Sequence, residues 1–308
     1  MIATRDAYGK KLAELGDKYP NIIVLDADLS GSTKTGVFAK KFPHRFFNMG
    51  VAEQDMMGTA AGLAACGKIV FASTFAIFAT GRAWEPIRQS IAYPHLGVKI
   101  CATHAGLTVG EDGASHQTVE DVTLMRAIPN MRVFVPADGI ETEKILEEIV
   151  KDDLPCYVRL SRAKSPVLFD ANYDFKIGKG NIIKKGKDVA LFTMGYVTSS
   201  VLEAANKLDE AGFSISVINM ASVKPIDEEL IVKVSKEHSF LASIEDHSTL
   251  GGLGSAISEV LTTHSPKALL RIGMNDEFGQ TGSAEEVLDF YGLTTPKITQ
   301  RLLQALKR

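Results

Sequence analysis

Short apolar segments alternate with helical segments along this chain, and the alternation restricts its fold more than any other feature. The run Asn21–Asp26 is apolar up to its final acid, as expected of a strand buried on both faces. Similar runs predict further strands at Phe46–Met49, Lys68–Ala72, Val98–Thr103, Arg132–Val135 and Cys156–Leu160. Strands that alternate with helices favour a mostly parallel sheet. We therefore predict an α/β fold, with ligands bound where the strands end.

The alternation is interrupted once, between Ser161 and Lys187. Pro166, Gly178 and Gly186 break any periodicity in this stretch. A second α/β unit then follows, with predicted strands at Asp188–Phe192, Ser214–Asn219, Phe240–Ile244 and Ala268–Ile272 and with helices near Thr198–Ala211 and after Gly251–Gly254. A length of 308 residues fits two domains. We predict domains at 1–162 and 188–308, joined by a linker at 163–187.

Charge and hydropathy exclude several functional classes. A net charge of −3 gives no general attraction to nucleic acid. No apolar run reaches the roughly 20 residues that span a membrane, and Met1–Pro20 reads as an amphipathic helix without the apolar centre of a signal peptide. Cys66, Cys101 and Cys156 are far apart and odd in number, which favours reduced thiols. We therefore expect a cytoplasmic protein without nucleic-acid or membrane partners.

Glu53 lies at the predicted start of a helix, directly after a predicted strand. Phe46–Met49 is predicted as a short buried strand, Gly50 as the turn, and Ala52–Ala65 as a helix of small residues. The helix N-terminus favours a charged carboxylate, whereas burial favours the protonated form. A carboxyl group under these opposing influences can exchange a proton with a ligand, so Glu53 is a candidate catalytic residue. The alternative is that it only complements the helix dipole.

The loop from His104 to His116 has the densest functional chemistry. It contains two imidazoles, two acids and three glycines directly after a predicted strand. Glycines let the backbone approach a ligand closely, and histidine and aspartate provide donors and acceptors for a polyhydroxylated or phosphorylated substrate. The spacing matches no zinc site, so we predict no metal ligands in this chain. A purely structural turn is the alternative.

Two further pairs are candidates for binding. Phe75 and Phe78 lie three residues apart on a predicted helix and could flank a flat ring, although the same spacing is common in cores. Arg159 and Arg162 lie near a strand end, where a guanidinium could bind a phosphate with two hydrogen bonds. Ordinary surface pairing is the alternative for the arginines.

Four segments of the chain match a known family in order and in spacing. They are Asp26–Ser30, Gly50–Gln54, Gly110–Gln117 and Pro136–Gly139, and they resemble the C-terminal half of transketolase, a thiamine-diphosphate enzyme. The resemblance covers essentially the whole chain. It implies a parallel-sheet pyrimidine-binding domain to about Leu160, followed by the smaller transketolase C-terminal α/β domain. The chain thus resembles the C-terminal subunit of a split transketolase.

The resemblance also implies a partner. The family's diphosphate-binding domain carries a Gly-Asp-Gly motif with a downstream asparagine that holds the metal, and this sequence has no Gly-Asp-Gly. The Mg²⁺ ligands and the diphosphate site are therefore expected from a separate N-terminal subunit. Because the family binds its cofactor between the two domain types, an α2β2 assembly is expected. The implied reaction transfers a two-carbon ketol unit between sugar phosphates.

The resemblance assigns a role to each candidate residue. Glu53 is implied to contact the ring nitrogen of the cofactor's aminopyrimidine, and to be catalytic together with His104 and His116. Phe75, Phe78 and Asp28 are implied to contact the cofactor. The implied substrate-binding residues are Arg5, Ser32, His104, Asp112, His116 and Arg162.

One departure keeps other thiamine enzymes open as alternatives. Full-length transketolases usually carry a further aromatic after the Phe75–Phe78 pair, whereas this chain continues with the Arg-Ala-aromatic run Arg82–Trp84. That run is closer to deoxyxylulose-phosphate synthase. This synthase, the beta subunit of a 2-oxo-acid dehydrogenase component and a non-catalytic regulatory subunit are the alternatives. The joint presence of Glu53, His104, Asp112 and His116 favours an enzyme.

Overall fold

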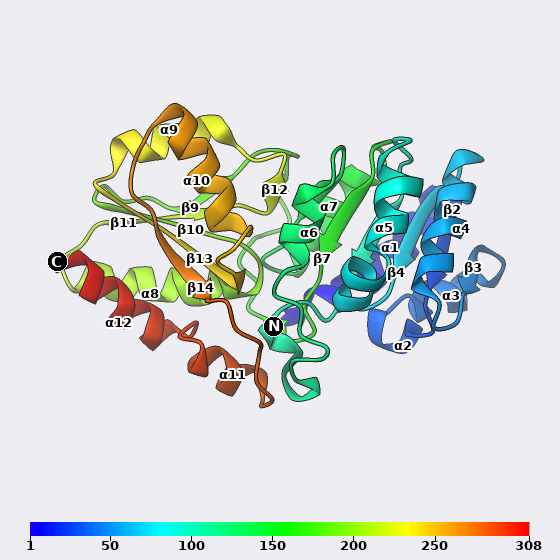
Figure 1. The fold of residues 1–308 in the computed structure, drawn as a ribbon, viewed down its shortest axis with the longest axis horizontal. Helices are drawn as coiled ribbons and strands as arrows, with labels where there is room; N and C mark the ends of the chain where they lie inside the picture. The colour runs from blue at the N-terminus through cyan, green and yellow to red at the C-terminus, as the bar shows by residue number, and fades with distance from the viewer. Residues whose placement is uncertain (308) are drawn as a thin grey trace.

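The computed structural model describes residues 1–307, which form two mostly parallel sheets covered by helices and one small two-stranded antiparallel sheet (Figure 1). The strands are β1 (Ile2–Ala3), β2 (Ile22–Asp26), β3 (Phe46–Asn48), β4 (Ile69–Ser73), β5 (Lys99–Ala102), β6 (Arg132–Phe134), β7 (Cys156–Arg159), β8 (Lys164–Ser165), β9 (Asn181–Lys184), β10 (Val189–Thr193), β11 (Ile215–Asn219), β12 (Ser222–Lys224), β13 (Phe240–Ser248) and β14 (Leu270–Met274). The helices are α1 (Thr4–Lys18), α2 (Ser30–Thr33), α3 (Gly36–Lys41), α4 (Glu53–Ala65), α5 (Trp84–Pro86), α6 (Asp121–Ala127), α7 (Gly139–Ile149), α8 (Thr198–Glu210), α9 (Glu228–Glu237), α10 (Leu253–His264), α11 (Ala284–Phe290) and α12 (Thr295–Leu306). Among residues 1–307, none of these helices has the length and apolar character to cross a bilayer.

The first sheet has the strand order β12-β6-β7-β5-β4-β2-β3. All neighbours from β6 to β3 are parallel, and β12 joins β6 antiparallel at the edge. The strands β2 and β5 are buried along their whole length, as their mainly apolar sequences lead us to expect. Each strand predicted from the sequence overlaps an observed strand, and the α/β prediction is confirmed.

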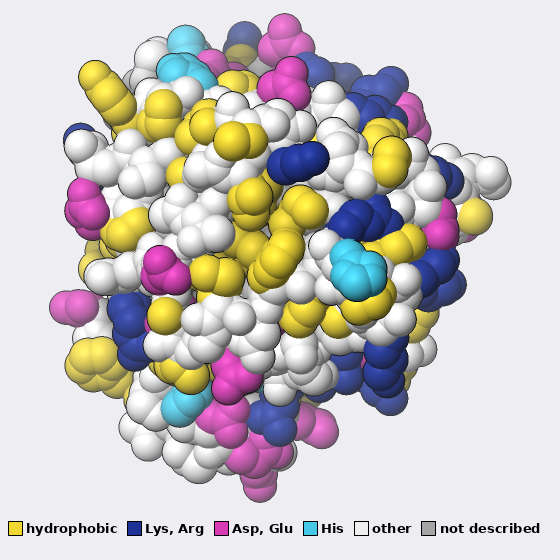
Figure 2. All heavy atoms as spheres, turned by 90° about the vertical axis from the view of Figure 1, so that its right-hand side faces the viewer, with side chains coloured by type: hydrophobic (Ala, Val, Ile, Leu, Met, Phe, Trp, Pro, Cys, Tyr) yellow, Lys and Arg dark blue, Asp and Glu magenta, His cyan; other side chains and the backbone are white. Residues whose placement is uncertain are grey.

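The strand β3 corrects one prediction. The segment Phe46–Met49 forms the expected strand, but it is not buried, because β3 is the edge strand of the first sheet and pairs only with β2. Phe47 is 47% exposed and Val51, in the following turn, is 73% exposed. Hydrophobic side chains gather on the face of the molecule that carries this edge (Figure 2). An edge strand has a neighbour on one side only, so this face is open to contact with another chain.

The second sheet has the strand order β14-β13-β10-β11-β9, and its edge strand β9 falls inside the stretch predicted as a linker. The strand β9 lies inside 163–187 and pairs antiparallel with β11. The sequence does not predict it, because its four residues lie among glycines and lysines and none is fully buried. Residues 1–162 are called the first unit below, and residues 181–307 the second unit. The precise domain boundaries stay a prediction.

The two units share apolar and polar contacts. One hydrophobic cluster includes Val135 from the first unit and Ile218 from the second. The carboxylate of Glu141, fully buried on α7, accepts hydrogen bonds from Tyr173 Oη at 2.6 Å and from Asn219 Nδ2 at 2.7 Å. Burial raises the pKa of Glu141 to about 7. The units are therefore joined by buried contacts as well as by the chain between them.

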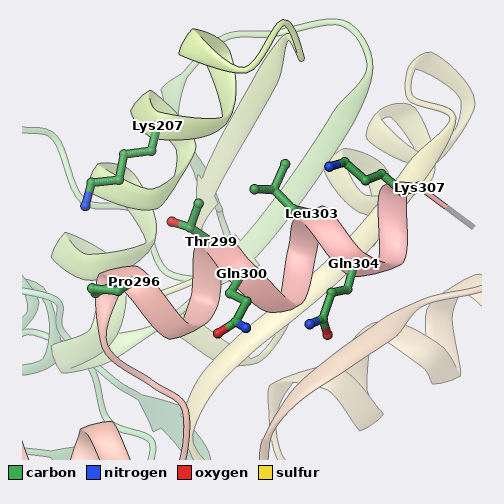
Figure 3. Close-up of a pocket in the computed structure, with 7 residues that line it drawn as sticks. All are labelled: Lys207, Pro296, Thr299, Gln300, Leu303, Gln304 and Lys307. Carbon is green, nitrogen blue, oxygen red and sulfur yellow. The ribbon is translucent and has the colours of Figure 1, made fainter.

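A groove lies between α8 and α12 in the second unit (Figure 3). Its volume is about 390 Å³. It is lined by Lys207, Pro296, Thr299, Gln300, Leu303, Gln304 and Lys307. None of these seven side chains is a carboxylate, a histidine or a predicted site residue, so the groove is separate from the site described below.

Candidate active site

The predicted site residues follow the C-terminal ends of neighbouring parallel strands. The strands β7, β5, β4, β2 and β3 are consecutive in the first sheet, and their ends therefore lie along the same edge. Arg162 follows β7 and His104 follows β5. Phe75 follows β4, and Glu53 follows β3 through the turn at Gly50, which has a φ of +70°. This convergence at the carboxyl ends of the strands is the usual position of ligand sites in α/β sheets.

Glu53 is the first residue of α4, and its side chain is only 1% exposed. Its Oε2 atom accepts a hydrogen bond from Arg82 Nη1 at 2.9 Å. Its Oε1 atom is buried and has no hydrogen-bond partner within residues 1–307. A buried carboxylate oxygen without a partner is costly, and such an exception requires an explanation. The free oxygen is available to a donor from outside this chain.

Arg82 lies at the end of a π-helical turn, Phe78–Arg82. Such turns are rare and occur frequently at functional sites. The guanidinium lies 5.0 Å from the centroid of the Phe78 ring, and the arginine side chain is 51% exposed. The carbonyl of Arg82 accepts a hydrogen bond from Gln54 Nε2 at 3.1 Å. Arg82 therefore connects the carboxylate of Glu53 to the aromatic residues of the site.

Four rings form one cluster at this edge of the sheet. The rings of Phe75 and His104 stack with centroids 3.8 Å apart, and those of Phe75 and Phe78 are nearly parallel with centroids 6.0 Å apart. The ring of His116 meets Phe78 edge-on at 5.6 Å. The structure thus brings both predicted histidines and both predicted phenylalanines together.

The expectation that the two phenylalanines flank a flat ring is wrong for this structure. Another ring needs about 3.5 Å on each side, or roughly 7 Å in total, and their centroids are 6.0 Å apart. The two residues also do not share a helix, because Phe75 forms an isolated bridge with Thr103 and Phe78 begins the π-helical turn. Together they can form one wall of a pocket.

His104 is buried and has neighbours on both ring nitrogens. Its Nε2 atom lies 3.1 Å from Arg5 Nη1, and its Nδ1 atom lies 2.9 Å from Thr103 Oγ1. Arg5 also donates to the carbonyl of Ser32 at 3.2 Å, so three predicted residues are in contact. Burial, together with the charges of Arg5 and Arg162, lowers the pKa of His104 to about 3. A neutral imidazole with a guanidinium beside Nε2 presents a lone pair to the arginine.

We predict that His104 stays neutral from pH 8 to about pH 4.5, because its folded pKa lies near 3. Histidine-selective NMR should show no titration of its ring signal in this range, whereas the urea-unfolded chain should titrate near pH 6.5. The His104→Gln variant identifies the signal. Since the folded pKa is below the unfolded value, the stability linked to this group is present above about pH 6.5 and is lost as the pH falls toward 3. A folded-state midpoint above about pH 5.5 would contradict this prediction.

Arg162 contacts the loop that contains Asp112. Arg162 Nη1 donates to the carbonyl of Val109 at 2.6 Å and to Glu111 Oε2 at 3.1 Å. The same nitrogen lies 3.7 Å from Asp112 Oδ2. Arg162 is half-buried, and two of its three partners are acids. The positive charge of its guanidinium is therefore balanced by the carboxylates of Glu111 and Asp112 on the loop.

Arg159 does not take part in ligand binding, which corrects the pairing of Arg159 with Arg162. Its side chain is 5% exposed, and its Nε atom donates to Asp121 at 2.9 and 3.1 Å. Its Nη2 atom donates to the carbonyls of Thr118 and Asp246. Because the hydrogen bonds of Arg159 are made inside the protein, it is a structural residue and not a phosphate ligand.

Asp28 lies on the loop after β2. It is exposed, has a φ of +63° and accepts a hydrogen bond from Asn48 Nδ2 at 2.7 Å. The neighbouring Asp26 is buried and accepts bonds from Thr33 and Thr35, which hold this loop in place. Asp26 thus supports the position of Asp28. Among residues 1–307, no group of three or more His, Cys, Asp and Glu residues could hold a metal ion.

The family of this chain follows from comparison with known proteins. The transketolase pyrimidine-binding domain matches residues 1–167, and the transketolase C-terminal domain matches residues 178–298. A candidate transketolase C-terminal section from Methanocaldococcus jannaschii is 52% identical over 307 residues, which cover 99% of this chain and 96% of that protein. The chain belongs to the transketolase family.

This chain spans about half the length of the full-length transketolases that it matches. Transketolase from Homo sapiens is 34% identical over 303 residues, which are 97% of this chain but only 48% of the human protein. A solved split-gene transketolase, an inactive beta4 tetramer, is 50% identical with a TM-score of 0.93 and matches 100% of this chain and 99% of its own. In extent, the chain therefore corresponds to the C-terminal half of a full-length transketolase and to one chain of a split one. The resemblance inferred from the four motifs is confirmed.

Two residues at or next to the candidate site are not assigned by the sequence. Arg82 is marked only by the Arg-Ala-aromatic departure, and the motif does not reveal its pairing with Glu53. Gln117 ends the Gly110–Gln117 motif, but its side chain bonds to the carbonyl of Gln280, 163 residues away. No local pattern predicts a contact over such a distance.

Proposed function

We propose that this chain is the C-terminal, pyrimidine-binding subunit of a two-subunit transketolase. The proposed reaction transfers a two-carbon ketol unit from a ketose phosphate to an aldose phosphate with thiamine diphosphate. The observation that carries the proposal is the unpartnered Oε1 atom of Glu53. The same carboxylate accepts a hydrogen bond from Arg82, whose guanidinium lies over the Phe78 ring. Phe78 in turn belongs to the ring cluster that contains Phe75, His104 and His116.

The residues present fit the aminopyrimidine end of the cofactor. A neutral ring nitrogen can share a proton with a buried carboxyl group, and Glu53 Oε1 is buried and free for such a bond. Phe75 and Phe78 provide an apolar wall of the kind that binds a flat ring. Asp28 is assigned to the entrance of the pocket, on the loop after β2. When bound, thiamine diphosphate supplies the nucleophilic carbon and the electron sink that ketol transfer needs.

In this proposal, each polar residue acts on the sugar or on a proton. Glu53 holds a proton between its Oε1 atom and the pyrimidine nitrogen. His104 and His116 face the reacting sugar, and a neutral His104 can donate or accept a hydrogen bond there. Asp112 accepts bonds from sugar hydroxyls. Arg5, Ser32 and Arg162 bind the sugar phosphate, since guanidinium groups fit phosphate oxygens.

The metal and diphosphate sites are assigned to a partner. The chain lacks Gly-Asp-Gly, and its described residues contain no metal-binding cluster, so the Mg²⁺ ligands are expected from an N-terminal subunit. The exposed side chains Phe47 and Val51, next to α4, are available for that contact. The inactivity of the related beta4 tetramer supports dependence on a partner. An α2β2 assembly in the cytoplasm remains our expectation.

Reconstitution tests this function. The chain alone should show no ketol transfer from xylulose 5-phosphate to ribose 5-phosphate. Addition of the Gly-Asp-Gly-containing subunit, thiamine diphosphate and Mg²⁺ should restore it. Turnover of pyruvate with an aldehyde phosphate would instead favour the deoxyxylulose-phosphate synthase alternative, and oxidative decarboxylation of a 2-oxo acid would favour the dehydrogenase alternative. A complex inactive with every donor would favour the regulatory subunit.

A further inference from the structure

The ends of loop 104–118 are fixed by the second unit. At the start of the loop, the backbone nitrogen of Leu107 donates to Asp246 Oδ1 at 2.9 Å. Just after the loop, the backbone nitrogen of Ser248 donates to the carbonyl of Val119 at 2.6 Å. Asp246 and Ser248 both lie on β13 of the second sheet. A single strand of the second unit therefore holds both ends.

Gln117, near the C-terminal end of the loop, connects the loop to the second unit. Its side chain is buried, with 5% of the residue exposed. Its Nε2 atom lies 3.4 Å from the carbonyls of Leu107 and Gly110 and donates to the carbonyl of Gln280 at 3.0 Å. The first two contacts close the loop on itself, and the third ties it to the segment before α11. The amide group of Gln117 thus contacts both the backbone of the loop and the backbone of the second unit.

The loop and the second unit approach too closely to allow side chains between them. A Cβ atom on Gly279 would lie 1.8 Å from Gln117 Oε1. A Cβ atom on Gly113 would lie 2.3 Å from Thr281 Oγ1, and Gly113 has a φ of +71°. Such distances are far inside van der Waals contact. The two surfaces therefore fit as one packed interface.

We propose that the second unit sets the working shape of loop 104–118, with Gln117 as the positioning residue for His116. The two side chains are adjacent in sequence but have different surroundings: Gln117 is buried against Gln280, whereas His116 meets the Phe78 ring. A displacement of the Gln117 amide moves the backbone that carries His116. The role of His116 toward the sugar rests on the proposed function, but the dependence of the loop on the second unit does not.

Hydrogen exchange of the isolated, full-length chain tests the structural part. In Gln117→Met, which keeps the side-chain length but removes the amide, backbone exchange in 107–118 should be at least about ten-fold faster, because local opening becomes easier. Gly279→Ala should have the same effect from the second unit, since the new methyl group displaces the Gln117 amide. Gln280→Ala is the matched control, because it keeps the backbone carbonyl that accepts the bond, and exchange should be unchanged.

Steady-state kinetics of the reconstituted complex tests the positioning role. In Gln117→Met and Gly279→Ala, kcat/KM for the acceptor sugar should fall about 10–10²-fold, the usual cost of a small misplacement of a reacting group. Cofactor affinity should remain within about two-fold, because neither residue faces the pyrimidine pocket. Unchanged exchange in both variants would overturn the proposal. Faster exchange with unchanged kcat/KM would reject the positioning role. An inactive wild-type complex would instead count against the proposed function, with the exchange result still deciding the structural part.

Discussion

Replacing Glu53 by alanine in the reconstituted complex is expected to lower kcat about 10²–10⁴-fold, the range typical for the loss of a proton-transfer group. The expectation follows from the structure around this carboxylate. One oxygen is fixed by Arg82, and the other is buried without a partner in residues 1–307. Steady-state ketol transfer with saturating cofactor measures the effect. Glu53→Gln should also be impaired, because an amide keeps the size of the side chain but cannot carry the proton.

Asp55 provides the matched control. It is another acid in the first turn of α4, but its side chain is exposed. If Glu53 only complemented the helix dipole, Asp55→Asn and Glu53→Gln would have similar small effects on stability and on turnover. In the proposed mechanism, only the Glu53 variants lose turnover. Near-normal turnover in Glu53→Ala would remove this residue from its catalytic role.

The second large effect concerns stability. Replacing Arg159 by methionine is expected to reduce the free energy of unfolding by about 3–5 kcal/mol, the cost of leaving a buried charge without its partner. The Arg159 guanidinium donates to Asp121, whose Oδ2 atom also accepts a 2.6 Å bond from Tyr157 Oη. Both members of the ion pair are buried. Urea unfolding monitored by circular dichroism measures the loss.

Two variants separate this explanation from a general packing defect. The double variant Arg159→Met/Asp121→Asn should recover part of the loss, because the neutral amide can still accept the bond from Tyr157. Arg88→Met, at an exposed arginine, should stay within about 0.5 kcal/mol of the wild type. A double variant less stable than Arg159→Met would show that the Asp121 charge is not the cause.

The position of the candidate residues at one edge of the sheet could be predicted from the sequence, because it depends on patterns of neighbouring residues in the chain. Asn21–Asp26 and Val98–Thr103 are mainly apolar runs followed by polar loops, and parallel strands place such loops at one edge. The turn at Gly50 and the helix starting at Glu53 have the same kind of local signal. These patterns were sufficient to place Glu53, His104 and His116 at one edge of a parallel sheet.

The remaining features depend on contacts between distant segments. The exposure of β3 depends on strand order, which an apolar run such as Phe46–Met49 does not encode. The pairing of Arg82 with Glu53 and the burial of Arg159 depend on side chains 29 and 38 residues apart. The bond from Gln117 to Gln280 joins the two units across 163 residues. In each case the sequence shows the residue type, but only the tertiary structure determines its partner.

Binding of thiamine diphosphate tests the central claim most directly, namely that this chain holds only part of the cofactor. Isothermal titration with thiamine diphosphate and Mg²⁺ should give no saturable heat with the chain alone. With the Gly-Asp-Gly-containing subunit added at equal concentration, it should give one site per copy of this chain, and Glu53→Ala should weaken that site. Stoichiometric, Mg²⁺-dependent binding by this chain alone, with the affinity of the two-subunit mixture, would contradict the account.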